Sequence, residues 1–134
     1  NGPRLAANAT HVAATWYTGV DGSVRVSFSP ADGSAFYFPL RVDEGASDGR
    51  GDCVFLPDGS LLVGWMARDE GQVAWWLRRV WPDGRFGEPY ALAEVAGDRD
   101  SGFLRLAVAD WNVWALWTEP GAEKRVAVAK MSLR

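Results

Sequence analysis

Short apolar runs that end in a tryptophan recur three times along this chain. The runs are VAATW to Trp16, LLVGW to Trp65 and VWALW to Trp117, and the tryptophans are separated by 49 and 52 residues. After each one comes a polar turn and then a segment in which apolar and polar residues alternate. Such alternation is what half-buried antiparallel strands require. The pattern therefore predicts one unit of strands and turns that is used three times.

A strand-and-turn repeat of about 40–50 residues is typical of β-propeller blades. We expect an all-β chain with one partial propeller domain over 1–134, in blades of about 1–47, 48–98 and 99–134. Two blades have four expected strands each, and the last is incomplete with three. The expected strands are 3–9, 12–18, 23–29, 38–43, 52–56, 60–68, 72–80, 88–94, 103–109, 112–119 and 124–133. A β-sandwich also has many short strands, but it does not explain three copies of one pattern.

Composition agrees with this fold and narrows the classes of function. The 134 residues are 48% hydrophobic and include 15 glycines and 7 prolines, as expected for many tight turns. The net charge is −3 and the basic residues are scattered, so no basic patch for nucleic acid is expected. The longest apolar runs have the length of a strand, so no membrane span is expected.

The single cysteine and the single histidine are weak candidates for chemistry. Cys53 has no partner for an internal disulfide, and its place on an expected strand indicates a small buried side chain rather than a nucleophile. His11 begins another expected strand. One cysteine and one histidine do not make a zinc site, and neither a metal nor another cofactor is expected.

One turn in the first blade carries a resemblance to a known family. Residues 29–36 read SPADGSAF, which is similar to the Asp-box S-x-D-x-G-x-T-W of sialidases, with the acid one place late at Asp32. A shorter version lies at 81–89. The acid is expected to cap backbone N–H groups, and the aromatic Phe36 to pack the hairpin onto its blade. In families with this motif it is a folding device on the outer rim.

The whole chain resembles the C-terminal half of a bacterial, sialidase-like, six-bladed propeller with BNR repeats. The segments that carry the resemblance are NGPRLAA, VAATWYT, PLRVD, LPDGSLLVGW and SGFLRLA. The resemblance implies a fragment that contributes to a site for a carbohydrate or an anionic small molecule. It also implies a periplasmic or secreted protein, and blades supplied by a missing N-terminal half or by another copy.

Residues that lead into the innermost strand of each blade are the candidates for this site. Twelve positions before the repeated tryptophan lie Arg4 in the first blade and Arg105 in the third, and the matching segment 48–52 holds Arg50 and Asp52. The resemblance implies three arginines that clamp a substrate carboxylate, which a guanidinium binds through two parallel hydrogen bonds. We therefore expect Arg4, Arg50, Asp52 and Arg105 to bind the ligand.

The same residues have a purely structural alternative. The arginines would instead form ion pairs that hold adjacent blades together, with partners among Asp48, Asp52, Asp98 and Asp100.

The catalytic set that the resemblance implies is incomplete, so the catalytic residues are unknown. A sialidase uses a tyrosine nucleophile assisted by a glutamate, with an aspartate as acid/base. Tyr17, Tyr37 and Tyr90 all lie away from the expected innermost strands, and the blade with the acid/base aspartate is not in this chain. We expect no hydrolysis by this chain alone.

Two features keep other functions open. Trp75 and Trp76 are adjacent on a strand, so one ring is expected in the core and the other either between blades or free to stack on a sugar. A half-propeller also leaves two apolar blade faces uncovered. The alternative function is a non-enzymatic interaction module that self-associates as a homodimer to complete six blades.

Overall fold

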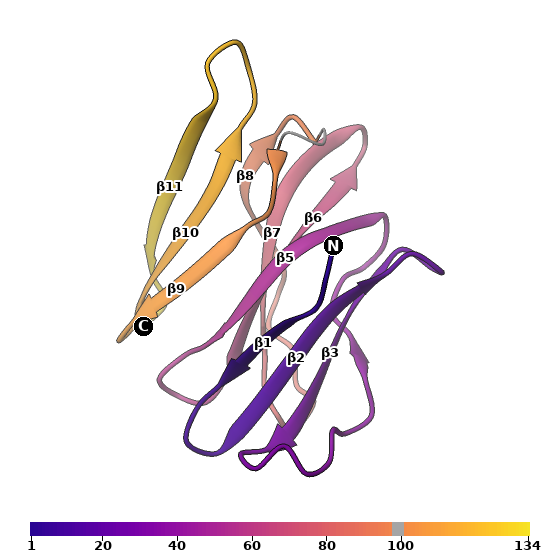
Figure 1. The fold of residues 1–134 in the computed structure, drawn as a ribbon, viewed down its shortest axis with the longest axis vertical. Helices are drawn as coiled ribbons and strands as arrows, with labels where there is room; N and C mark the ends of the chain where they lie inside the picture. The colour runs from indigo at the N-terminus through magenta and orange to yellow at the C-terminus, as the bar shows by residue number, and fades with distance from the viewer. Residues whose placement is uncertain (98–100) are drawn as a thin grey trace.

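Eleven β-strands form three sheets in the residues that the structure, a computed structural model, describes, which are 1–97 and 101–134 (Figure 1). The first sheet has the order β1 (Arg4–Ala7), β2 (His11–Thr18), β3 (Ser23–Pro30) and β4 (Leu40–Arg41). The second has the order β5 (Ser47–Phe55), β6 (Leu61–Asp69), β7 (Gln72–Val80) and β8 (Tyr90–Val95). The third has the order β11 (Arg125–Ser132), β10 (Asn112–Glu119) and β9 (Arg105–Ala109). The predicted all-β architecture of partial propeller blades is confirmed.

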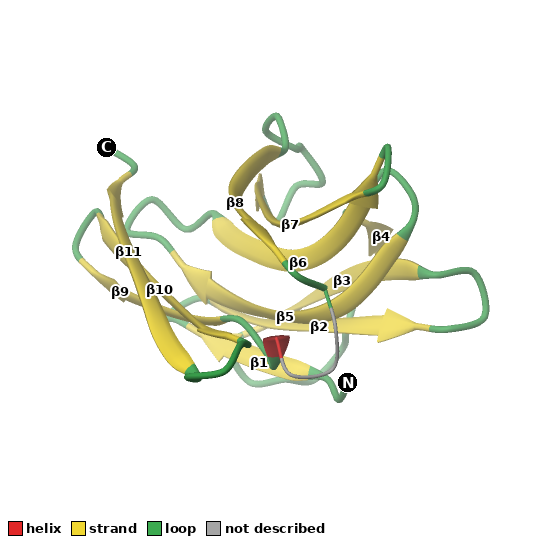
Figure 2. Cartoon of the chain, turned by 90° about the horizontal axis from the view of Figure 1, so that it is seen from above, coloured by secondary structure: helices red, strands yellow, loops and turns green. Residues whose placement is uncertain are grey.

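The innermost strands of the three sheets lie side by side. β1, β5 and β9 are each an edge strand of their own sheet, and β5 contacts both of the others. The view from above shows the three curved sheets connected by loops (Figure 2). Sheets that meet along their first strands are arranged as propeller blades are around their axis. No helix in the described residues is long and apolar enough to cross a membrane.

The second sheet is covered on both faces because neighbouring residues of a strand point to opposite sides. On β6, Val63 and Trp65 pack against the first sheet, whereas Leu62 and Met66 pack against the third. The adjacent tryptophans of β7 divide in the same way, as predicted. Trp75 is fully buried against the third sheet, and Trp76 is half-buried on the side of the first.

β5 begins at Ser47, whereas the sequence predicts a strand that starts at Asp52. Its pairing with β6 shifts register between Ser47 and Gly49 and again between Gly49 and Asp52. Gly49 and Arg50 have positive φ angles of 73° and 56°. Irregular strands of this kind are β-bulges, and the glycine-rich, charged segment 48–52 is therefore a bulged strand and not a loop.

The aspartate-glycine turns behave in part as predicted. Oδ1 of Asp32 accepts a hydrogen bond of 2.9 Å from the backbone N–H of Ser34. The hydroxyl of Ser34 and then this N–H lower the pKa of Asp32. The prediction that Phe36 packs the hairpin onto its blade is wrong, however, because this side chain is 47% exposed. The physical reason is that only two residues form β4. Before them Tyr37 bonds to β3, through its N–H to the Phe28 carbonyl at 2.7 Å, but the preceding Phe36 is not in a paired strand.

Cys53 lies buried on β5, as predicted. Burial, together with the negative charge of Asp52, raises the pKa of its thiol to about 12. The thiol therefore stays protonated near neutral pH and does not act as a nucleophile.

Candidate functional site

The four predicted site residues all lie on innermost strands. Arg4 is on β1, Arg50 and Asp52 are on β5, and Arg105 is on β9. Arg4 and Arg50 line one crevice of about 20 Å³ between the first two sheets. A space of this size holds one water molecule, so the crevice does not enclose a larger ligand.

Arg105 is not part of this crevice. Leu104 and Leu106, its neighbours on either side, are buried against the second sheet, so the Arg105 side chain points to the opposite, exposed face of β9. Its guanidinium donates a hydrogen bond of 3.0 Å to the Leu104 carbonyl and lies 5.6 Å from the centre of the Phe103 ring. The structure therefore brings together two of the three predicted arginines.

Asp52 joins all three sheets. Its side chain is only 8% exposed and accepts a hydrogen bond of 3.3 Å from Nε of Arg4 on β1. It also accepts bonds of 2.9 Å from the backbone N–H of Leu106 on β9 and of 2.9 Å from the N–H of Cys53. This geometry fits the structural alternative, in which an ion pair holds adjacent blades together. Binding of a ligand by Asp52 and the arginines stays a prediction.

The bulge of β5 extends this connection through the backbone. The side chain of Asn1 accepts a hydrogen bond from the N–H of Arg50 at 2.8 Å and donates one to the carbonyl of Asp48 at 2.8 Å. The carbonyl of Arg50 accepts a bond of 2.9 Å from the N–H of Leu104. Asp48 also pairs with Arg68 at 3.0 Å. Asp98 and Asp100 lie outside the described residues.

One tyrosine reaches the crevice from outside the innermost strands. Tyr17 lies on β2, the second strand of its sheet, as expected, and lines the same crevice as Arg4 and Arg50. A β-carbon on Gly49 would lie 2.6 Å from that of Tyr17, so β5 passes directly against this side chain. Spacing along the sequence misses this contact because it depends on the bulge of β5.

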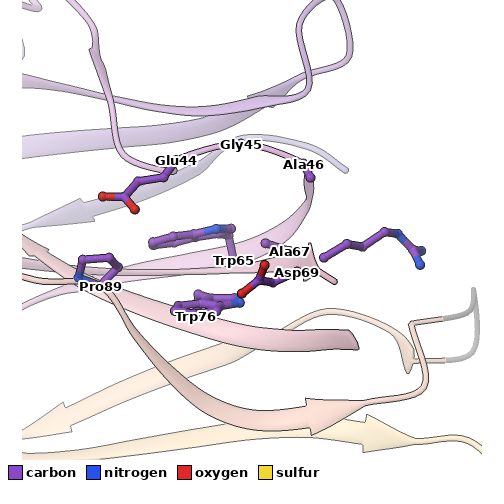
Figure 3. A pocket seen from close by; sticks show the side chains of 9 residues that line it. Glu44, Gly45, Ala46, Trp65, Ala67, Asp69, Trp76 and Pro89 are labelled. Atoms are coloured by element: carbon purple, nitrogen blue, oxygen red, sulfur yellow. The ribbon is translucent and has the colours of Figure 1, made fainter. Parts of the chain in front are cut away.

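A larger cavity, of about 360 Å³, lies between the second sheet and the connection from β4 to β5 (Figure 3). Its walls come from the connection between β4 and β5, from β6 and β7, and from the residue before β8. The side chains that give it chemical character are those of Glu44, Trp65, Arg68, Asp69 and Trp76. This volume lies within the range of about 300–1,000 Å³ that small-molecule sites occupy.

Two indole rings and two carboxylates lie around this cavity (Figure 3). Trp65 is 2% exposed, whereas Trp76 is half-buried. The Glu44 side chain is 69% exposed and its carboxylate lies 3.8 Å from Arg78, while Asp69 ends β6 in an exposed position. An aromatic face with acceptor groups beside it suits a ligand that is apolar on one side and hydroxylated at its edges.

Arg68 is held in place at the rim of the cavity. Its Nε pairs with Asp48, and its Nη2 donates a hydrogen bond of 3.3 Å to the carbonyl of Gly97. The cavity wall is therefore tied to the start of β5 and to the residues that follow β8. Among the cavity side chains, the sequence pointed only to the pair Trp75 and Trp76, of which one ring was expected either between blades or free to stack on a sugar. Glu44 and Asp69 carry no signal, because their position depends on how the two sheets pack.

No family model matches this chain, and no curated protein matches it. Among solved structures it is similar to the α-L-arabinofuranosidase PaAbf62A from Podospora anserina in complex with cellotriose. The TM-score is 0.55 at 13% identity, and the match covers 97% of this chain and 53% of that one. At this identity the likeness shows the fold alone, which is of the β-propeller type. The chain spans about half the length of the structure that it matches.

Proposed function

We propose that this chain is part of a β-propeller that binds a carbohydrate in the cavity between the second sheet and the connection from β4 to β5. The observation that carries the proposal is the half-buried Trp76 beside the carboxylates of Glu44 and Asp69 in a cavity of about 360 Å³. A sugar ring presents C–H groups on its face and hydroxyls at its edge. The indole matches the former and the carboxylates accept hydrogen bonds from the latter.

A finer version of this proposal follows the resemblance to sialidases, in which the ligand is an anionic glycan. Arg4 and Arg50 would then contact its carboxylate, and their shared crevice supports this pairing. The Arg105 side chain faces the other way, so it would contact the same ligand only if that ligand extended across β9. We propose no hydrolysis by this chain alone, because Tyr17 in the crevice has neither the glutamate nor the acid/base aspartate that the resemblance requires.

Calorimetric titration with cellotriose and with 3′-sialyllactose tests both versions. For the cavity, Trp76→Ala is expected to weaken cellotriose binding about tenfold, which corresponds to ~1.4 kcal/mol, and Trp76→Phe to retain most of it. Trp81→Ala, a half-buried tryptophan outside the cavity, is the matched control and is expected to change nothing. Absence of cellotriose binding would overturn the cavity proposal. Sialyllactose binding that is lost in Arg4→Gln but kept in Trp76→Ala would favour the arginines instead.

A second candidate function is a non-enzymatic interaction module that self-associates as a homodimer and completes a six-bladed propeller. The exposed apolar face of the third sheet favours it, because Trp114 is 43% and Leu116 is 42% exposed. Contiguous apolar surface of this kind marks interaction sites in soluble proteins.

A further inference from the structure

We infer that a second copy of this chain packs head to tail against the first, with the third sheet of each copy on the first sheet of the other. The inference rests on the second candidate function and names the two surfaces that meet. It is independent of sugar binding in the cavity.

Each sheet has two distinct faces, which the internal contacts define. We call the face turned toward the preceding sheet the rear face and the one turned toward the following sheet the forward face. Within the chain, Val26 and Phe28 on the forward face of the first sheet meet Trp65 on the rear face of the second. Trp75 on the forward face of the second sheet meets Trp117 on the rear face of the third. The same kind of contact is therefore formed twice.

The rear face of the first sheet is built like the other two but has no partner sheet. Trp16 occupies in β2 the place that Trp65 and Trp117 occupy in β6 and β10. Trp65 and Trp117 are 2% and 6% exposed, whereas Trp16 is only half-buried. Leu5, which pairs with Ala14 on this face, is 71% exposed. These side chains are apolar where a preceding sheet would cover them.

The forward face of the third sheet is equally uncovered. Trp114 stands at the place of Leu62 in the repeat, yet it is 43% exposed and Leu62 is fully buried. On the neighbouring strand β11, Val126 and Val128 are 65% and 58% exposed. Leu116 on β10 is paired with Val128, so these two side chains lie side by side. A patch of four large apolar side chains on two adjacent strands is unusual for a monomer surface.

A second copy fits these surfaces because one chain carries both halves of the contact. The forward face of its third sheet and the rear face of its first sheet are both uncovered. Inside the chain, a forward face packs against a rear face at both contacts between sheets. Two chains related by a two-fold axis bury both pairs at once, so the assembly closes and does not grow into a fibre.

Multi-angle light scattering of the full chain over a range of concentrations tests this inference. The expected mass is twice the 14.6 kDa of one chain. Leu116→Asp damages the forward face, and Leu5→Lys damages the rear face. Each variant alone is expected to raise the dimer dissociation constant at least tenfold. Val20→Asp, in an exposed turn away from both faces, is the control and should remain dimeric. Circular dichroism checks that each variant is folded, and Val128→Asp replaces Leu116→Asp if the latter is not.

An equimolar mixture of the two damaged variants gives the sharpest result. One of the two contacts in a mixed dimer joins an intact forward face to an intact rear face, so dimers are expected to return. A monomeric wild-type chain, or a mixture that does not form dimers, would overturn the inference. The two faces would then be surfaces for other blades. Calorimetry with cellotriose on the same variants separates the two proposals, because neither substitution lies in the cavity.

Discussion

At the scale of single residues, Asp52 shows how one buried carboxylate can organise three sheets. It accepts backbone N–H groups from β5 and β9 and the guanidinium of Arg4 on β1, so its charge is compensated where water is largely excluded. The sequence placed Asp52 near the meeting point of the blades. It did not indicate which of the nearby charges are buried together, since spacing gives the strand of a residue but not the partner that its side chain meets.

Replacement of Asp52 should therefore act on stability. Asp52→Ala leaves the N–H groups of Leu106 and Cys53 buried without an acceptor, and we expect a loss of about 2–4 kcal/mol in the free energy of unfolding. Asp52→Asn keeps one acceptor oxygen and should lose about half as much. Urea unfolding measures both, with the exposed Glu94→Ala as a control that changes stability by less than about 0.5 kcal/mol. Wild-type stability in Asp52→Ala would contradict this role.

At the scale of elements, strands between clear turns were predictable and irregular ones were not. β7 and β10 begin and end at the residues that the sequence indicates, because each is an apolar run with turn residues on both sides. β5 was predicted too short because the glycines and charges of 48–52 are also typical of a loop. Only the pairing with β6 makes this segment a strand, and this contact is remote along the chain.

The close approach of β5 and β6 at the bulge gives a prediction for Gly51. A β-carbon at this position would lie 1.7 Å from the carbonyl oxygen of Gly64, so Gly51→Ala forces the two backbones apart. We expect a loss of about 3 kcal/mol or more, measured by urea or thermal unfolding. Gly19→Ala is the matched control, because its added carbon would meet only Tyr17 at 4.0 Å and should shift stability by less than about 1 kcal/mol. Equal stabilities for the two variants would show that the strands are not this close.

At the scale of the whole molecule, the repeat specified the architecture, and the packing of sheets specified the site. Trp16, Trp65 and Trp117 each lie on the second strand of a sheet, as their spacing predicted. The cavity with Glu44 and Asp69 was not predictable in the same way. It depends on where the connection between β4 and β5 passes the second sheet, and a connection without a strand has no apolar pattern to follow.

Burial across the three sheets predicts an order of local stability. Residues 61–67 of β6 are all buried between two neighbouring sheets, whereas no residue of β11 is fully buried. Hydrogen exchange in dilute solution should therefore be slowest in β6, and clearly faster in the hydrogen-bonded amides of β10, whose sheet is covered on one face. If a second copy packs on the uncovered face, a higher protein concentration should slow hydrogen exchange in β10. Exchange in β4, which frays whether or not two chains associate, should slow less. Exchange in β10 that is as slow as in β6 in the dilute monomer would contradict the order. If the exchange rate in β10 does not depend on protein concentration, the forward face of the third sheet stays exposed to water even when a partner chain is abundant.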